Sequence, residues 1–380
     1  MKDRIKPKPM DRKKDATPDM HYDVALLFPV LFLVGIGIVM VYSASSALAL
    51  DASKPDYFFL RKQAIFGMAG CVVLVIFRHI PYRAYKLMAY PLLILAILFL
   101  IAIQVTDFGL AAGGAVRWFR MGSFSFQPSE LARFALIVYL AYSLSKKKDR
   151  IKDFSIGFLP HVLMLGIISA LIMIQPNFGT VILIVALTWL MLFAGGVRFF
   201  HLLSASLLIL PIAYFLAMNA EYRVKRLMSF LDPWQYPTDE GYQIIHSLMA
   251  FGTGGLWGTG IGKGYQKLFY LPEPHTDFIF SVIGEELGLI GVMVILVLYG
   301  MILWRGIAVA RKAKDDFGAL LAIGLTASLG LQACINIGVT LSLLPTTGLT
   351  LPFISYGGTS LLLSMAAVGV LMNIGLSRGR

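Results

Sequence analysis

The run VALLFPVLFLVGIGIVMVYSA, residues 24–44, decides the fold class. It carries no charged residue, and it is as long as the roughly 20 residues that an α-helix needs to cross the hydrocarbon core of a bilayer. The run is too long for the apolar core of a signal peptide, and no obvious cleavage site follows it. We therefore expect it to stay in the protein as the first membrane span.

The composition of the whole chain agrees with this reading. The 380 residues are 58% hydrophobic and only 14% charged, with a mean hydropathy of +0.76. Ordinary soluble domains carry about 25% charged residues. Similar apolar runs recur, so the sequence predicts an all-α integral membrane protein, a polytopic bundle of about ten transmembrane helices. The predicted spans are residues 24–44, 63–78, 85–105, 128–145, 156–174, 178–195, 199–219, 278–304, 317–341 and 354–376.

The positions of lysine and arginine orient these spans, because cytoplasmic connections carry an excess of both. With ten spans, all the basic groups fall on one side: the tail 1–22, residues 78–86, 146–152, Arg198, 305–314 and the C-terminus. The net charge of +12 therefore indicates a membrane topology and no nucleic-acid partner. Both termini are predicted to be cytoplasmic. Residues 1–22 are predicted to be a disordered basic tail, and residues 23–380 a single transmembrane domain.

The remaining connections must lie outside the membrane on the other side. They include residues 106–127 and 342–353, and the largest is the loop 220–277 between spans seven and eight. Most of the glycine-rich and proline-rich sequence lies in these connections, so we expect an extracytoplasmic active site. Nucleoside triphosphates are not normally present there, which argues against an enzyme that uses ATP.

The stretch LPEPHTDFIF, residues 271–280, places Glu273, His275 and Asp277 directly before an apolar span. Ionisable groups at the edge of hydrocarbon usually mark a pathway or a site. An acid at the position of Asp277 is commonly a helix N-cap or first-turn residue, and it could also act as a general base toward a substrate from the outer leaflet. His275 is expected to form hydrogen bonds, because no second His or Cys stands at the spacing of metal ligands.

Three further stretches combine unusual residues on the same side. In AVRWFRMGSFSFQPSE, residues 115–130, Pro128 can start a helix, and Glu130 shares one face with Arg133; this is either a capped, neutralised helix start or a charge pair facing a cavity. GTGGLWGTGIGKG, residues 252–264, matches no nucleotide-binding pattern and is either a mobile loop or an anion-binding nest of backbone N–H groups. LSLLPTTGLTLPFISYGGTS, residues 341–360, is either a re-entrant packing element or a cavity lining.

Two adjacent acids, Glu285 and Glu286, lie about 12 Å along the eighth span from Asp277, at the helical rise of about 1.5 Å per residue. Because adjacent helical residues point in different directions, we expect one acid to meet Arg133 or a backbone group. The other is expected to reach a cavity.

Together the motifs RWFRMGSFSFQPSE, QPNFGT, QKLFYLPEPHTDFIFSVIGEELG and INIGVTLSLLPTTGLTLPFISYGGTSLL resemble the SEDS family (shape, elongation, division and sporulation), from about residue 24 onward. Within the family, the motifs are closer to the cell-division branch than to the elongation branch. The resemblance implies a peptidoglycan glycosyltransferase of the bacterial cytoplasmic (inner) membrane that polymerises lipid II during septal wall synthesis. It also implies a class B penicillin-binding protein and division-complex proteins as partners, besides membrane lipids.

The resemblance places the essential aspartate of the family on Asp277 and its Gln-Pro-Ser-Glu motif on residues 127–130. Two positions depart from the family pattern: Arg133 stands where lysine is frequent, and Asn177 stands where aspartate is frequent. The candidate substrate-binding residues are Arg117, Arg120, Gln127, Ser129, Glu130, Arg133, Lys263, Lys267, His275, Glu286, Ser355 and Tyr356.

The chemistry implied for lipid II is one inverting displacement, because the donor sugar is α-linked to pyrophosphate and the product link is β-1,4. Asp277 is assigned as the base, and the basic residues of the external side are candidates for the diphosphates. A divalent cation, Mg or Mn, could help, but the sequence contains no dedicated ligand set. Two other classes remain open: a lipid II flippase, which intramembrane charges also suit, and a scaffold that recruits partners through its basic tail.

Overall fold

The computed structural model describes residues 23–106, 109–112, 115–121, 124–219, 221–238, 240–268 and 274–376. The predicted tail 1–22, the acid Glu273 and the arginines after residue 376 lie outside these described residues.

A helix lies at every predicted span. These helices are α1 (Val24–Asp51), α2 (Phe58–His79), α3 (Ala84–Val105), α4 (Pro128–Lys146), α5 (Leu159–Ile174), α6 (Phe178–Ala194), α7 (Phe199–Met218), α10 (Ile279–Arg311), α11 (Asp316–Thr340) and α12 (Gly358–Leu376). Within the described part of the chain, seven helical segments are long and apolar enough to cross a bilayer, and α6 and the first part of α7 are shorter apolar helices. The protein is therefore a multi-pass helical membrane protein.

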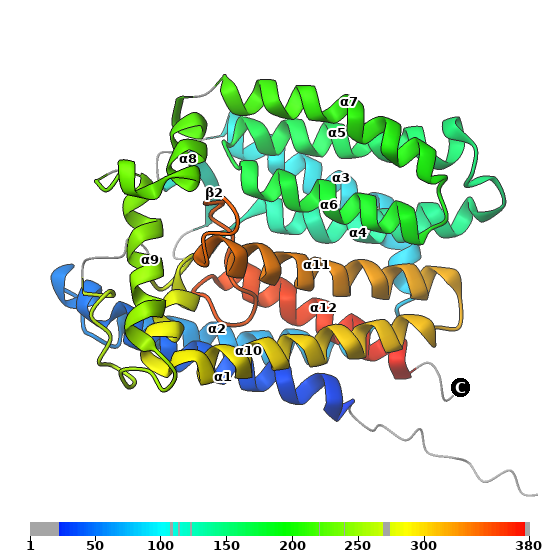
Figure 1. The fold of residues 1–380 in the computed structure, drawn as a ribbon. Coiled ribbons are helices and arrows are strands. Elements are labelled where there is room, and N and C mark those ends of the chain that lie inside the picture. Colours follow the sequence, from blue (N-terminus) through cyan, green and yellow to red (C-terminus); the bar gives the residue numbers. More distant parts are fainter. Residues whose placement is uncertain are drawn as a thin grey trace, which may run out of the picture.

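The long helices run side by side along one direction (Figure 1), and α11 and α12 are the most buried of the long apolar ones. The start of α1 and the end of α12 lie at the same end of the bundle. At the opposite end, α8 (Glu221–Leu231) and α9 (Glu240–Gly254) form part of the α7–α10 connection. The long predicted loop thus contains two helices of its own.

A three-stranded antiparallel sheet lies in the α3–α4 connection and corrects the all-α prediction. Its strands are β1 (Gly109–Ala112), β2 (Ala115–Met121) and β3 (Phe124–Phe126), in the order β1-β2-β3. Aromatic and β-branched residues, which β2 and β3 contain, favour strands, but such short strands are easily overlooked beside the long apolar runs.

The basic connections meet at the end of the bundle where α1 begins. Three ion pairs join connections that are far apart in sequence: Lys86 with Asp315 at 2.9 Å, Lys148 with Asp316 at 2.8 Å, and Arg305 with Asp23 at 2.7 Å. The clustering of lysine and arginine inferred from the sequence is therefore a clustering in space.

Asp315 has a second role as the N-cap of α11, where its Oδ1 accepts a hydrogen bond from the N–H of Gly318 at 2.9 Å. Burial alone would raise the pKa of Asp315, but the hydrogen bonds from Lys86 and from this N–H outweigh it, so the pKa is held below its ordinary value. The charged carboxylate is thus the form that the folded state favours.

The irregular segment 341–357 lies among the helices and is covered by two close approaches. A Cβ added at Gly37 of α1 would stand 2.8 Å from the backbone of Ile354, and one at Gly179 of α6 would stand 2.4 Å from the carbonyl oxygen of Thr347. The hydroxyl of Tyr299 donates to the carbonyl of Pro352. Backbone without regular hydrogen bonding is tolerated at such a depth only under protein cover or against a cavity, and these contacts supply the cover.

Candidate functional site

Asp277 lies at the joint between α10 and the segment 341–357. Helix α10 begins at Ile279 with Phe278 as its N-cap, so Asp277 is neither the cap nor a first-turn acid. The residue is half-buried, and its Oδ2 would stand 3.6 Å from a Cβ placed at Gly348. Because Gly348 has φ of +73°, a conformation that favours glycine, the space beside the carboxylate is kept clear of a side chain.

The backbone directly before Asp277 is fixed by hydrogen bonds. The hydroxyl of Ser355 donates to the carbonyl of Thr276 at 2.7 Å, and the N–H of Tyr356 donates to the carbonyl of His275 at 2.9 Å. His275 is buried, with its ring 4.8 Å from that of Phe59 and 5.5 Å from that of Tyr356. Three predicted residues, His275, Ser355 and Tyr356, therefore lie around Asp277 and hold its backbone in place.

The predicted pair Glu130–Arg133 is present and buried. One guanidinium nitrogen of Arg133 lies 2.6 Å from Oε2 of Glu130, and the other donates to Oε1 of Gln332 at 2.6 Å. The two charged side chains are only 5% and 6% exposed. Arginine can serve two acceptors with separate nitrogens, whereas lysine offers a single charged nitrogen.

Two amides on α11 connect this pair to Asp277. Gln332 donates to the carbonyl of Thr350 at 2.9 Å, and Asn336, one turn further along, donates both to the carbonyl of Leu349 at 2.7 Å and to the carbonyl of Asp277 at 2.8 Å. Both amides are buried. A continuous path of hydrogen bonds and backbone thus runs from the charge pair to the aspartate.

A second polar cluster surrounds Glu286 in α10. Nζ of Lys267 lies 2.6 Å from Oε1 of Glu286 and donates to the hydroxyl of Ser43 in α1 at 2.8 Å, and that hydroxyl donates to the same carboxylate. All three side chains are buried. Lys267 and Glu286, both predicted to bind substrate, are therefore engaged with each other, and Lys267 would have to leave Glu286 to contact a diphosphate.

The glycine-rich run 252–264 and the two residues after it donate backbone N–H groups to carboxylates of the protein itself. Oε1 of Glu285 accepts from the N–H of Tyr265 at 2.7 Å, and Oε2 of Glu286 accepts from the N–H of Gly262 at 3.0 Å. Residues 252–254 are the last of α9. The expectation that one acid meets a backbone group holds for Glu285, and the run is tied to α10 along much of its length.

The other predicted residues lie in different surroundings. Arg117 on β2 donates to the carbonyls of Gln175 and Pro176, at 3.2 and 2.7 Å, and so holds the turn before α6. Arg120 lies exposed on the same strand, and Lys263 is exposed in the glycine-rich run. Ser129 is fully buried. The residues predicted from sequence therefore lie in three groups: around Asp277 and the Glu130–Arg133 pair, around the Lys267–Glu286 pair, and at the turn that Arg117 holds.

Two other predicted positions, Asn177 and Gln127, each stand at the start of a helix. Asn177 caps α6, with its Oδ1 accepting from the N–H of Thr180 at 3.3 Å, so the amide performs a role that a carboxylate could also perform. The backbone N–H of Gln127, the N-cap of α4, donates to the hydroxyl of Thr359 at 3.3 Å. This bond joins the start of α4 to α12.

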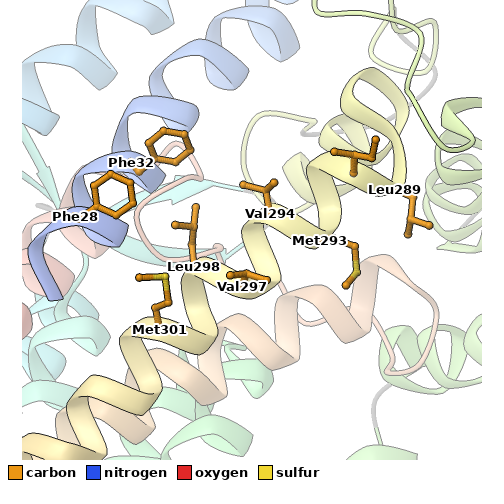
Figure 2. Close-up of a pocket in the computed structure, with 9 residues that line it drawn as sticks. Phe28, Phe32, Leu289, Met293, Val294, Val297, Leu298 and Met301 are labelled. Atoms are coloured by element: carbon orange, nitrogen blue, oxygen red, sulfur yellow. The ribbon is translucent and has the colours of Figure 1, made fainter. Parts of the chain in front are cut away.

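Two further features concern metal ions and apolar ligands. Among the described residues, no group of three or more His, Cys, Asp or Glu side chains is arranged to hold a metal ion. A cavity of about 590 Å³ lies between α1 and α10, where Phe28 and Phe32 face Val294, Val297 and other apolar residues of α10 (Figure 2). Its lining offers no ionisable group for chemistry and suits hydrocarbon.

Known proteins are similar to this chain over nearly its whole length. The model of a family described as "Cell cycle protein", covering FtsW, RodA and SpoVE, matches residues 24–379. A protein of Geobacter metallireducens named "Probable peptidoglycan glycosyltransferase FtsW" is 47% identical over 354 residues, which cover 93% of this chain and 94% of the relative. Stage V sporulation protein E of Bacillus subtilis is 41% identical over 355 residues, covering 93% and 96%.

Solved structures resemble the fold over almost the whole chain. A chain from a peptidoglycan synthase complex, described as coordinating polymerization and crosslinking, superposes with a TM-score of 0.78 at 30% identity and covers 94% of this chain and 99% of its own length. The rod shape determining protein RodA of Thermus thermophilus superposes with a TM-score of 0.70 at 29% identity, covering 95% and 99%.

Proposed function

The chain belongs to the FtsW, RodA and SpoVE family of cell cycle proteins, and on this premise we propose that Asp277 is the general base with which it polymerises lipid II. The protein is a peptidoglycan glycosyltransferase of the type that acts in cell division. Lipid II carries a disaccharide–peptide on a pyrophosphate, with a polyprenyl tail that stays in the bilayer. The enzyme therefore needs polar chemistry at one end of the bundle and contact with hydrocarbon along its sides.

The reaction is one inverting displacement. Asp277 accepts the proton of the acceptor 4-hydroxyl while that oxygen forms a bond to the anomeric carbon of the donor sugar. The bond from this carbon to the pyrophosphate breaks, and polyprenyl pyrophosphate leaves with the electron pair. General-base help of this kind contributes about 10²–10⁴-fold. Lys263 and Arg120 are exposed, and in the proposed topology they lie on the same side of the membrane as Asp277, so they are the candidates to meet the diphosphates.

One observation carries the assignment to Asp277. Among the described acids of the predicted site, Glu130, Glu285 and Glu286 are buried and bound to Arg133, backbone N–H groups and Lys267 respectively. Asp277 is half-buried, beside the cleared space at Gly348, on backbone that hydrogen bonds hold in place. A base must combine such fixed geometry with access to the substrate hydroxyl.

The topology that fits this function has ten crossings, cytoplasmic termini and an extracytoplasmic site. It is supported by the basic connections, which meet at one end of the bundle and form three ion pairs there. Cytoplasmic connections are enriched in Lys and Arg. The helices of the α7–α10 connection lie at the opposite end, as Figure 1 shows. The polar head of lipid II would be met there.

The proposed partner is a class B penicillin-binding protein, together with other proteins of the division complex. A structural relative comes from a complex that coordinates polymerization with crosslinking, and a class B penicillin-binding protein would supply the crosslinking. An elongation role like that of RodA is the alternative assignment within the same chemistry, because RodA shares the fold.

The experiment replaces Asp277 with Asn in the purified full-length protein and measures polymerisation of fluorescent lipid II in detergent, with and without the partner. Asn keeps the size and removes the charge, so polymer formation should fall by about 10² or more. Asp51→Asn, at the exposed end of α1, is the matched control and should polymerise normally.

Polymer formation by the Asp277 variant near the unmodified rate would remove the catalytic assignment, and His275 would be tested next. The same assay separates the flippase alternative, which the buried charges Glu130, Arg133, Lys267 and Glu286 favour. A flippase makes no polymer in detergent, where the substrate has no membrane to cross.

A further inference from the structure

A second cavity, of about 350 Å³, lies apart from the candidate site. It is lined by the α4–α5 connection and the start of α7: Arg150, Lys152, Asp153, Phe154, Ser155, Ile156, Arg198 and His201. The α4–α5 connection also carries Lys148, which pairs with Asp316 at the start of α11. The cavity therefore belongs to the end of the bundle where the basic connections meet.

The lining carries an excess of positive charge. Three permanent cations, Arg150, Lys152 and Arg198, face a single carboxylate, Asp153. Asp153 pairs with Arg150 at 3.3 Å. Within the described part of the chain, Lys152 and Arg198 form no ion pair. Two exposed cations of the lining are thus left without an acidic partner among the described residues, and an anionic group could bind to them.

The walls of this cavity are held in place by contacts across it. The ring of His201 on α7 lies 5.4 Å from that of Phe154 and 5.9 Å from that of Phe158, and its Nε2 lies 3.4 Å from the carbonyl oxygen of Lys152. At the base of the turn, Gly157 approaches Ile151 so closely that an added Cβ would stand 1.8 Å from its carbonyl oxygen. The two elements that carry the cations are therefore joined before any ligand arrives.

Exposed aromatic residues belong to the lining or follow it directly in sequence. Phe154, in the lining, is 49% exposed, and Phe199 and Phe200, next to Arg198 in the chain, are 65% and 73% exposed. All three stand at the ends of apolar helices, where aromatic side chains commonly meet the membrane–water interface. A free anion would gain nothing from contact with these exposed phenyl rings. A phospholipid would gain from it, because its phosphodiester would enter the cationic cavity while its acyl chains lie along the phenyl rings and the sides of α5 and α7.

We propose that this cavity binds the phosphodiester head group of an anionic phospholipid. Basic pockets between membrane helices are suited to such head groups by charge, and each lysine or arginine near an anionic membrane surface adds to the affinity. In the proposed topology the lipid comes from the cytoplasmic leaflet. The site is separate from the glycosyltransferase chemistry, so its test does not depend on catalysis.

The test uses the full-length protein in a zwitterionic detergent and three probes: dioctanoyl phosphatidylglycerol, dioctanoyl phosphatidylcholine and inorganic phosphate. Binding is measured by native mass spectrometry at stepped probe concentrations. The double variant Lys152→Gln/Arg198→Gln removes two cavity cations. The control Lys312→Gln/Lys314→Gln removes the same charge from the exposed α10–α11 connection, and thermal unfolding checks that each variant is folded.

Phosphatidylglycerol should bind more tightly than phosphatidylcholine. The cavity variant should weaken phosphatidylglycerol binding by roughly 30-fold, from the usual contribution of two cations near an anionic surface, and the control by less than about threefold. If the double variant does not fold, Arg198→Gln alone should weaken binding by roughly fivefold.

Three results would overturn the proposal. Equal affinity for the two lipids would remove the role of charge, and equal weakening in both double variants would mean a diffuse basic surface with no specific cavity. Inorganic phosphate that displaces phosphatidylglycerol at the concentration of the lipid itself would identify a site for free anions, to which the acyl chains contribute nothing.

Discussion

Removing one partner of the Glu130–Arg133 pair should destabilise the protein far more than removing both. The side chains are 5% and 6% exposed and 2.6 Å apart, so Arg133→Met leaves a carboxylate buried without its cation. Breaking a buried ion pair in this way costs about 3–5 kcal/mol. Glu130→Gln leaves a buried guanidinium whose remaining contact is Gln332, and we expect a cost of the same order.

The double variant Glu130→Gln/Arg133→Met contains neither charge. Replacing a whole buried pair by neutral groups of similar volume is often close to neutral for stability, so the double variant should recover most of the loss. Because the two single losses sum to about 6–10 kcal/mol and the double variant loses little, the coupling free energy between the two positions should be about 6 kcal/mol or more. Thermal and denaturant unfolding of the four proteins in one detergent measures it.

Activity should not recover together with stability. If the pair positions Asp277 through Gln332 and Asn336, the neutral double variant should be folded and still impaired in polymerising lipid II. Arg133→Lys, which restores the residue frequent in the family, should keep the pair with Glu130 but lose the second contact, the one to Gln332. A double variant whose loss of stability equals the sum of the two single losses would refute this reasoning, and so would a double variant with full activity.

Three further predictions test other parts of the structure. Asn336→Leu removes the amide that holds the carbonyl of Asp277, so kcat should fall by about 10², the effect of a small misplacement, while KM for lipid II changes little. Because the pKa of Asp315 is lowered in the folded protein, its stabilising effect is present at neutral pH and is lost as pH falls through that folded-state pKa. Asp315→Ala should therefore lose about 1 kcal/mol at pH 7 and differ less from the unmodified protein in unfolding scans at acid pH. Single cysteines at Asp149 and Thr238, both exposed, should react with an impermeant thiol reagent from opposite sides of the membrane, and labelling of both from one side would contradict the ten-crossing topology.

The helices could be predicted from the sequence because the bilayer imposes a length. Each apolar run had to be long enough to cross, and the spacing of Lys and Arg then fixed which connections belong together. The observed α10 continues to Arg311, seven residues beyond the predicted end at 304, because a helix can extend past the hydrocarbon. The small sheet at 109–126 was missed, since its strands are short and lie between stronger signals.

The candidate site was predicted only in part. The contact between Glu130 and Arg133 was predicted because an acid and a base three residues apart are visible in the sequence, and the structure contains it. An acid beside an apolar run is equally visible, which is how Asp277 was selected, and its catalytic role stays a prediction. Gln332 and Asn336 were missed, although two amides four residues apart in an apolar helix are a usable signal. The pairing of Lys267 with Glu286 could not be read from sequence, because it depends on how the glycine-rich run folds back onto α10.

That folding back also limits how this region can diverge or be engineered. A Cβ at Gly258 would stand 2.2 Å from the carbonyl oxygen of Glu286, and one at Gly288 would stand 2.4 Å from the nitrogen of Gly258. Both clashes are with backbone atoms, so a side chain at either position would push the run and α10 apart. A designer who wants a freer loop would instead have to alter the charges that hold it.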